Sequence, residues 1–492
     1  MPPPNSLDNN RQSVCINCKL RKRKCDKSLP QCGHCTRKRL ECRYVPRGSE
    51  EPLARGRPSL TGPIAHNPAI RSSLLLSNIF SDMLLLEPTN IESAVYLQIY
   101  RIIRATGGTF DEINNRYFRG IHTFVPIISP DRFNDKLDKL QGAAPPTDLS
   151  VLLLSMCLVT YHPEFSHSQN TEPPHLSTLY LTTKSLFAQV QASSSLSLPL
   201  IQAGVLIAVY EYSSGRYSES IASIGYCARM GISHGLHLVN PPGITDDELF
   251  TQVEEWNTWW SIFICERTFI CEARELLQPL IAQAPEIEAN RATKLEDFPL
   301  SDLSESKRIP NLPDDPSQER GAFASVARAA WLLDRTLQSL RIADDDLRIA
   351  QLKKLDSLLQ NLLAVGLRRA GGFRGLWCTG NAVMMRTLFV IHRHILYQDS
   401  TPTACNSPTE MERQNSYTAL NTVSMMMLDI AAAQNKLSLS LIDTLPPSVS
   451  YIIHAALDHV KAMNLLGEER IHVENQLSWT LGMLQKRWYD TA

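Results

Sequence analysis

The chain has 492 residues, of which 43% are hydrophobic and 20% are charged. This composition excludes a wholly disordered chain and predicts a large folded body with at least one separate module. No apolar run approaches the roughly 18 residues that a membrane-spanning helix needs, so we do not expect a membrane protein. Residues 1–10 have neither a basic start nor an apolar stretch. We therefore expect no secretory signal, and a reducing compartment in which the cysteines are thiols.

The net charge of −1 hides a strong asymmetry along the chain. Residues 1–60 contain 14 Lys and Arg against 5 Asp and Glu, whereas the remaining residues contain 35 against 45. A basic segment attached to an acidic body is typical of a nucleic-acid-binding module joined to a larger domain.

Six of the twelve cysteines lie in this basic segment and form an internal repeat. Each half has the spacing Cys-x2-Cys-x6-Cys, and the second half repeats the first with an offset of 17 residues. Two cysteines separated by two residues can bind one tetrahedral ion, and thiolates in a reducing compartment favour zinc. The expected zinc ligands are Cys15, Cys18, Cys25, Cys32, Cys35 and Cys42.

Each half supplies three thiolates, whereas a tetrahedral zinc ion needs four ligands. Two zinc ions can therefore be satisfied only if two sulfurs bridge them, and the repeat symmetry predicts that the bridging residues are equivalent. We assign the bridging positions to Cys15 and Cys32, the first cysteine of each half; the spacing is also compatible with another equivalent pair. A disulfide framework and a loose zinc buffer are the alternatives. The first needs an oxidising compartment, and the second does not explain the attached apolar body or the cations between the thiolates.

The cysteine segment resembles the fungal binuclear zinc cluster family of transcription regulators. The resemblance covers residues 15–42 without a gap, including the basic run CINCKLRKRKCD at 15–26 and Pro30 between the halves. It implies two zinc ions bridged by Cys15 and Cys32, in agreement with the ligand count. Many relatives have glycine at the position of Arg39, where a left-handed backbone would cost this chain on the order of 1 kcal/mol.

The cations of this segment point to DNA. Nine Lys and Arg and two acidic residues lie between Cys15 and Cys42, which favours phosphate as a partner. A short helix after Cys18 would turn Leu20 inward and project cations outward. In the family, the lysine matching Lys22 reads guanines of a CGG triplet in the major groove. The remaining expected DNA contacts are Lys19 and Arg23, with Arg21, Lys24, Arg37 and Lys38 assigned to phosphates.

The run 21–24 also fits a nuclear localisation signal, and the same cations can serve both nuclear import and DNA binding.

The segment 44–70 contains five prolines and little apolar content, which excludes a helix. It has no heptads, so the short coiled coil through which many relatives dimerise is not expected. Arg55-Gly56-Arg57-Pro58 resembles the core of an AT-hook, in which arginines enter the minor groove of A/T-rich DNA. Arg55 and Arg57 are therefore candidate minor-groove contacts, with a solvated basic linker as the simpler alternative.

Helical periodicity dominates from about residue 74 onward. Apolar residues recur at three- and four-residue steps over 75–86, and clearer helices are expected over 199–212 and 217–234. The last two should form an antiparallel pair. The small residues expected to allow its close approach are Ala222, Gly225 and Ala228.

These stretches resemble the all-helical middle homology region that follows the zinc cluster in the same family. The resemblance rests on YEYSSGRYSESIASIGYCARMGISHGLH at 210–237, on a motif around Tyr117-Phe118, and on Trp259-Trp260 with Glu266-Arg267. It covers about residues 110–275 and weakens after Arg267, where relatives commonly have a Gly-Arg-Pro turn. The expected fold is a small binuclear zinc cluster module at the N terminus plus a large all-α regulatory domain.

We expect no enzymatic activity, because the body shows no nucleophile beside a base, no glycine-rich phosphate loop and no metal-ligand constellation. Its scattered cysteines and the Met425–Met427 run are expected in the core. Acidic runs at 245–248 and 344–346 are expected to be helix starts or solvated faces rather than activation segments.

The expected organisation is a disordered tail at 1–10, the zinc cluster at 11–47, the linker at 48–73 and the helical regulatory domain at 74–492. The expected function is sequence-specific DNA binding in the nucleus at CGG-type sites, regulating RNA polymerase II transcription. By family precedent we expect the chain to activate a metabolic or secondary-metabolite gene set. Expected partners are double-stranded DNA and co-regulators, with a homodimer and a small-molecule effector left open. The alternative is a helical ligand-sensing or scaffold protein whose zinc module mediates protein contacts, which salt-dependent binding to a CGG probe would distinguish.

Overall fold

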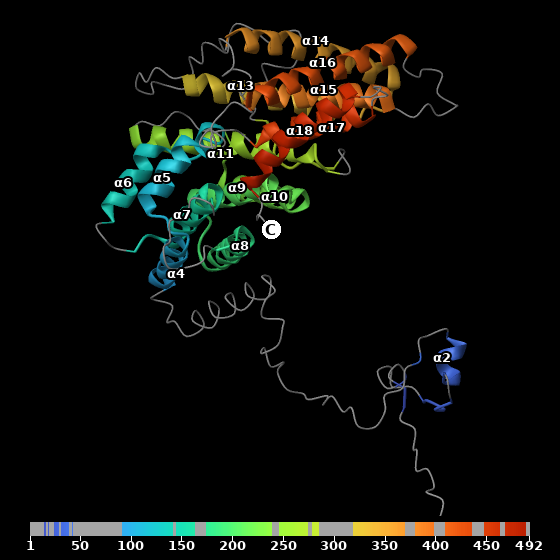
Figure 1. The fold of residues 1–492 in the computed structure, drawn as a ribbon. Helices are drawn as coiled ribbons and strands as arrows, with labels where there is room; N and C mark the ends of the chain where they lie inside the picture. Colours follow the sequence, from blue (N-terminus) through green and yellow to red (C-terminus); the bar gives the residue numbers. More distant parts are fainter. Residues whose placement is uncertain are drawn as a thin grey trace, which may run out of the picture. The chain divides into compact units, whose positions relative to one another are not determined.

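The computed structural model of the chain divides into two compact units, residues 1–67 and 68–492 (Figure 1). The division falls within the proline-rich segment that separates the zinc module from the helical body. The structure describes residues 14–15, 18, 24–28, 31–38, 42, 91–140, 144–162, 174–238, 246–273, 278–284, 318–369, 379–397, 409–434, 447–462 and 468–488.

Several predictions from the sequence lie outside the described residues. These are the expected helix over 75–86, the boundaries at 10/11, 47/48 and 73/74, and six expected DNA-contacting residues. The six residues are Lys19, Arg21, Lys22, Arg23, Arg55 and Arg57.

The second unit is built from helices, and its described residues contain no strand, which confirms the expected all-α class. No helix among the described residues is long and apolar enough to span a bilayer. The helices of its first half are α4 (Ile91–Ala105), α5 (Phe110–Arg119), the 3-10 turn η3 (Ile121–Thr123), α6 (Pro130–Lys139), α7 (Thr147–Thr160), α8 (Leu176–Ser193), α9 (Leu198–Ser213), α10 (Tyr217–His234) and α11 (Asp246–Ile270).

Helices α7 and α9 form the centre of this half. Both sequences are apolar on every side, and residues 200–213 of α9 are all buried. Helices α4, α5 and α8 pack around α7 and α9, and α10 covers another side of α9. A helix without a polar face can be stable only when neighbours surround it, so the composition of α7 and α9 accounts for their central place.

Helices α9 and α10 form the pair predicted from the sequence, and α10 ends at Gly235, whose φ of +88° favours glycine. Of the three small residues expected at the contact, Ala228 is buried, whereas Ala222 and Gly225 do not face α9. A Cβ at Gly204 of α9 would lie 2.8 Å from the sulfur of Cys227, whereas Ala222 is exposed. Gly225 faces Ile281 instead of α9.

The second half has its own core. In Figure 1, helices α13 to α16 run side by side, with α15 in contact with α13, α14, α16 and α17. The acidic runs lie at the starts of α11 and α14, as expected, but Met425 is 51% exposed rather than buried. The helices of this half are α13 (Gln318–Ser339), α14 (Asp345–Arg369), α15 (Thr379–Tyr397), α16 (Glu410–Gln434), α17 (Ser448–Ala462) and α18 (Glu468–Lys486).

A buried ion cluster joins the two halves at the Glu266-Arg267 motif of α11. The Arg267 guanidinium donates to Asp334 of α13 at 2.9 Å and to Glu266 at 2.5 Å. The Glu266 carboxylate also accepts the backbone N–H groups of Ile281 and Ala282 at 2.8 and 2.9 Å. All the charges of the cluster are paired, which is the condition for burying them at tolerable cost.

A second joint lies at the end of α18. The Arg487 guanidinium, 4% exposed, donates to the carbonyl oxygens of Val159 and Tyr161 at 2.9 and 2.8 Å, at the end of α7. Trp488 contacts the ring of Tyr210 edge to face. A cation at a helix C terminus satisfies carbonyls that have no partner within the helix.

Replacing Arg487 with leucine should lower the free energy of unfolding of the helical unit by about 2–4 kcal/mol, because two buried carbonyls lose a charged donor. Urea denaturation followed by circular dichroism measures the change. Exposed Lys486, changed to alanine, is the control and should shift stability by less than about 0.5 kcal/mol. Equal effects of the two substitutions would contradict a capping role for Arg487.

Candidate metal centre and nucleic-acid interface

A five-residue helix, α2 (Gly33–Arg37), organises the second half of the cysteine repeat. Cys32 is its N-cap, and the Cys32 sulfur accepts the backbone N–H of Cys35 at 3.4 Å. The first half repeats this local geometry, because the Cys15 sulfur accepts the backbone N–H of Cys18 at 3.5 Å. In both halves the Cys-x2-Cys spacing thus lets the first sulfur accept the backbone N–H of the second cysteine.

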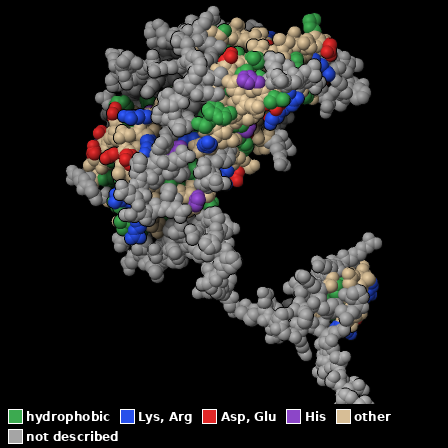
Figure 2. Space-filling view, in the orientation of Figure 1, with side chains coloured by type: hydrophobic (Ala, Val, Ile, Leu, Met, Phe, Trp, Pro, Cys, Tyr) green, Lys and Arg blue, Asp and Glu red, His purple; other side chains and the backbone are tan. Residues whose placement is uncertain are grey.

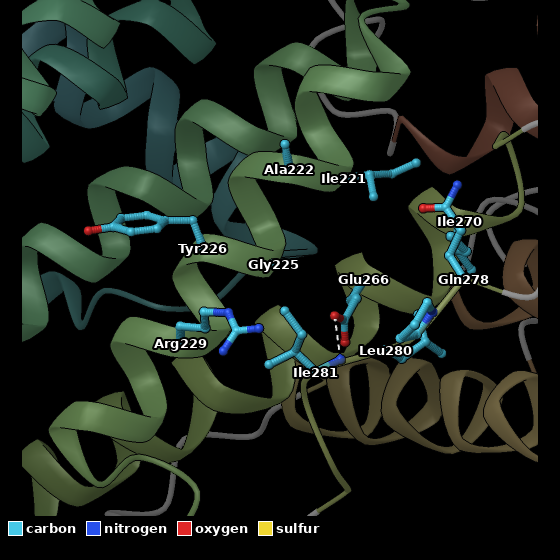
Figure 3. A pocket seen from close by; sticks show the side chains of 11 residues that line it. Ile221, Ala222, Gly225, Tyr226, Arg229, Glu266, Ile270, Gln278, Leu280 and Ile281 are labelled. Atoms are coloured by element: carbon cyan, nitrogen blue, oxygen red, sulfur yellow. Dashed lines mark hydrogen bonds between the residues drawn. The ribbon is translucent and has the colours of Figure 1, made fainter.

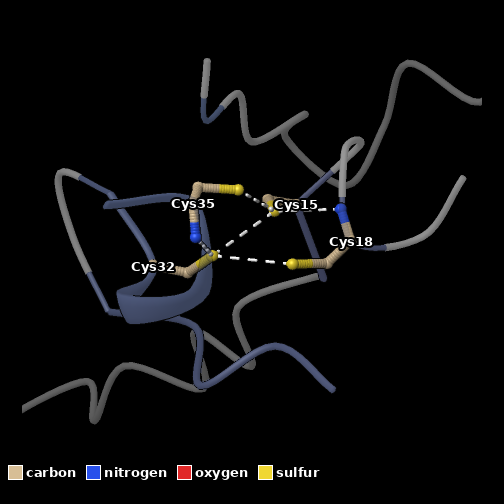
Figure 4. Close-up of side chains that lie close together, drawn as sticks. All are labelled: Cys15, Cys18, Cys32 and Cys35. Carbon is tan, nitrogen blue, oxygen red and sulfur yellow. Dashed lines mark hydrogen bonds between the residues drawn. The ribbon is translucent and has the colours of Figure 1, made fainter. Parts of the chain in front are cut away.

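Four buried sulfurs converge from the two halves (Figure 4). The Cys15 sulfur lies 3.8 Å from those of Cys32 and Cys35, and the Cys32 sulfur lies 3.6 Å from that of Cys18. A tetrahedral zinc ion with Zn–S bonds of about 2.3 Å separates its sulfur ligands by about 3.8 Å. These distances fit a zinc thiolate site.

Cys15 and Cys32 hold the central positions of the cluster. Each has a sulfur contact to the other half, Cys15 to Cys35 and Cys32 to Cys18. The remaining two cysteines, Cys25 and Cys42, are half-buried and pack against the other four. Cys42 accepts the backbone N–H of Cys32 at 3.2 Å. All six expected ligands therefore belong to one cluster.

The surroundings lower the pKa of one cysteine thiol and raise the pKa of two others. The Cys35 backbone N–H lowers the pKa of Cys32 to about 6, which favours the thiolate. Burial raises the pKa of Cys35 to about 12 and raises the pKa of Cys18 as well. A metal must displace protons from such thiols, so metal binding releases protons and weakens as the pH falls.

Asp26 ties the two halves together, and the repeat does not predict this role. Its carboxylate oxygens accept the backbone N–H of Gly33 at 2.9 and 3.0 Å, at the start of α2. Hydrogen bonds from Ser28 and from this N–H hold the pKa of Asp26 below its usual value. The equivalent position in the second half is Arg43, so the symmetry of the repeat does not predict a carboxylate at residue 26. An acid directly after Cys25 and a glycine directly after Cys32 are the signals that could have indicated it.

Close packing explains why residue 33 is glycine. A Cβ at this position would lie 2.6 Å from a carboxylate oxygen of Asp26. The left-handed residue of the described module is Lys27, with φ of +61°, while Arg39 lies outside the described residues.

Cations lie on the surface of the module, as Figure 2 shows for the first unit. Of the residues assigned to phosphates, the structure describes Lys24, Arg37 and Lys38, and all three are exposed. Arg37 donates through Nε to the carbonyl of Gly33 at 3.2 Å, which fixes its side chain along α2 and leaves its other N–H groups for a ligand. Exposed cations on a rigid metal-bound unit suit phosphate contacts.

Among the described residues of the helical unit, Asp356, His392 and Ser416 have the composition of a catalytic triad. His392 lies 3.2 Å from Asp356 through Nε2 and 3.2 Å from Ser416 through Nδ1. Ser416 is 2% exposed and His392 is 5% exposed, so no substrate reaches the hydroxyl. The hydrogen-bond chain links α14, α15 and α16, and we interpret it as packing rather than catalysis.

Comparisons with known proteins agree with both units. Residues 13–51 match the model of the fungal Zn(2)-Cys(6) binuclear cluster domain, and residues 115–272 match that of the fungal specific transcription factor domain. The chain is 36% identical over 149 residues to a protein named "Transcription factor BOA15" from Botryotinia fuckeliana (strain B05.10). The match covers 30% of this chain and 76% of that protein. No solved structure matches the chain significantly.

Changing Asp26 to alanine should weaken zinc affinity by about 10- to 100-fold, because partners that position metal ligands contribute on this scale. Competition for zinc with a chromophoric chelator measures the loss. Asp26→Asn retains one acceptor oxygen and should fall between, while exposed Gln31→Ala should leave affinity unchanged.

The clash at residue 33 gives a sharper version of the same test. Gly33→Ala should weaken zinc binding in the natural chain and should cost much less in the Asp26→Ala background, where the opposing carboxylate is gone. Additive losses would show that Asp26 and Gly33 do not act on each other.

Removing the metal with a chelator should unfold the first unit and leave the second folded, because the two units have separate cores. DNA binding should disappear while the helical circular dichroism signal and its thermal transition persist. Restoring zinc should restore DNA binding. Loss of the helical transition on chelation would contradict this independence.

Proposed function

The chain belongs to the fungal Zn(2)-Cys(6) binuclear cluster family of transcription factors, and we propose that it reads CGG-type DNA sites in the nucleus through a module holding two zinc ions. The coarser description, a zinc-binding and DNA-binding regulator of transcription, follows from the family itself. The family also indicates a regulatory rather than an enzymatic role.

The proposed ligand assignment gives each ion four thiolates. One ion takes Cys15, Cys18, Cys25 and Cys32, and the other takes Cys32, Cys35, Cys42 and Cys15. The cross-half sulfur contacts of Cys15 and Cys32 support their bridging role, because each already approaches ligands of the other half. Zinc supplies the charge that holds the thiolates together. The protein residues orient the sulfurs through the backbone N–H groups of Cys18 and Cys35.

The loaded module would carry a net charge of about +5, which favours the DNA backbone. We assign base reading to Lys22, because a lysine donates well to O6 and N7 of guanine in the major groove. Arg21, Lys24, Arg37 and Lys38 are assigned to phosphates, and Lys19 and Arg23 to the same interface. Arg55 and Arg57 remain candidate contacts in the minor groove of flanking A/T-rich DNA.

The observation that carries this proposal is the convergence of sulfurs from both halves at tetrahedral spacing, beneath exposed cations. The helical unit is the proposed regulatory part, which contacts co-regulators and is compatible with a homodimer or a small-molecule effector. We propose that the chain acts as an activator of a metabolic or secondary-metabolite gene set and regulates RNA polymerase II.

Binding to a CGG probe and a scrambled probe tests the two kinds of DNA contact. Lys22→Ala should weaken binding to the CGG probe by about 10- to 100-fold and leave the scrambled probe almost unchanged, because a base contact contributes about 1–3 kcal/mol of discrimination. Arg37→Ala should weaken both probes similarly and should reduce the slope of log affinity against log salt by about 1.

Fluorescence anisotropy at several salt concentrations provides both readouts, and native mass spectrometry gives the zinc count of the same sample. Equal losses on both probes for Lys22→Ala would remove its reading role. A zinc-loaded chain that ignores DNA at low salt would instead favour the alternative, a module that mediates protein contacts.

A further inference from the structure

The regulatory unit contains a pocket of about 340 Å³ between α10, the end of α11 and the segment 278–281 (Figure 3). This volume lies at the lower end of the range of small-molecule sites, roughly 300–1,000 Å³. One wall comes from the part of the chain that matches the family model, residues 115–272. The other wall, 278–281, lies beyond that match.

The middle of the pocket is apolar. Ile221 of α10, Ile270 of α11, and Leu280 and Ile281 of the facing segment line it. Gly225 forms part of the α10 wall without a side chain, and a Cβ there would lie 3.3 Å from Cδ1 of Ile281. The two walls therefore meet at Gly225, and the surface of Ile221, Ile270 and Leu280 beside this contact suits the apolar body of a ligand.

The pocket lies where the two cores of the helical unit meet. Ile270 and Leu280 belong to or pack against the second core, Ile281 packs against the first, and Ile221 packs against both. A molecule bound here would contact both halves at once. Ligand sites occur preferentially at such interfaces.

The polar groups of the lining differ in whether another residue already binds them. Both oxygens of Glu266 are occupied by the backbone N–H groups of Ile281 and Ala282 and by Arg267. The Tyr226 hydroxyl is hydrogen-bonded to Gln191. Arg229 is exposed, and its guanidinium makes no hydrogen bond or ion pair within the part of the chain that the structure describes.

The side-chain amide of Gln278 is a second polar group of the lining. Its backbone carbonyl accepts a hydrogen bond from Arg341 at 2.6 Å, but its side-chain amide has no partner among the described residues. In Figure 3, Arg229 extends from α10 beside Ile281, whereas Gln278 lies on the side of Ile270. A charged donor and an amide thus flank the apolar lining.

We propose that this pocket binds a small organic carboxylate with an apolar body, whose carboxylate pairs with Arg229 and whose body packs against Ile221, Ile270 and Leu280. This inference rests on the proposed regulatory role of the helical unit and names the effector class. A bidentate guanidinium–carboxylate pair provides both charge and geometry for such a ligand. By bridging the two cores, the bound molecule stabilises their joint and gives the regulatory unit a ligand-dependent state.

The test uses the zinc-loaded full chain with 4-phenylbutyrate as the probe and 4-phenylbutanol as its uncharged counterpart, with affinities measured by saturation-transfer NMR. The natural chain should bind the carboxylate at least about tenfold more tightly than the alcohol, as expected for a hydrogen-bonded charge pair. Arg229→Gln should abolish this preference. Arg104→Gln, an exposed cation on α4, is the matched control and should preserve it.

Two further variants test the location. Gly225→Val fills the wall, and Ala222→Phe, at an exposed position of the lining, blocks the space without entering the core. Each should weaken both probes by at least about tenfold. Because Ala222 is exposed, its variant keeps the test valid even if Gly225→Val lowers stability.

The proposal is overturned if phenylbutyrate fails to bind at millimolar concentration, if the alcohol binds as well as the acid, or if the pocket variants bind like the natural chain. Binding of every variant to the CGG probe is measured in parallel. Retained DNA binding with no ligand binding rejects the pocket alone, whereas lost DNA binding by the natural chain rejects the proposed function.

Discussion

The repulsion between closely spaced thiolates is the constraint on which the DNA-binding module depends. Four sulfurs lie within 4.8 Å of one another, in a unit whose described part has no other buried hydrophobic cluster. Such a small unit cannot bury enough apolar surface to fold by hydrophobic burial alone. Metal coordination supplies the missing free energy and also offsets the negative charge of the thiolates, so the bound metal determines folding, rigidity and the presentation of surface cations.

The helical unit has a different source of stability. Two hydrophobic cores account for its size, and paired buried charges specify how they join. Arg267 connects α11 to α13, and Arg487 returns from the last helix to the end of α7, more than 320 residues earlier. Buried polar links contribute less to stability than apolar packing, but they penalise other arrangements of the helices because each unpaired charge is costly. The joint between the cores is accordingly where a ligand could change the state of the unit.

The hydrogen-bond chain of Asp356, His392 and Ser416 shows why function cannot be assigned from composition of a site alone. The same residue types serve as a catalytic triad only when the hydroxyl is accessible and a reacting carbonyl can be stabilised. Here the three residues hold adjacent helices together in the interior. Their exposure, and not their identity, separates a structural role from a catalytic one.

The sequence by itself determined the family, the six-cysteine cluster, the all-helical class and the α9–α10 pair, because spacing and periodicity are local properties of the chain. Only the tertiary structure decided which small residue allows close approach, Gly204 instead of Ala222, and that Asp26 holds the start of α2. It also decided that Arg229 and segment 278–281 share a pocket. These features depend on contacts between residues distant along the chain or on breaks in a repeat, and neither leaves a periodic signal from which it could be predicted.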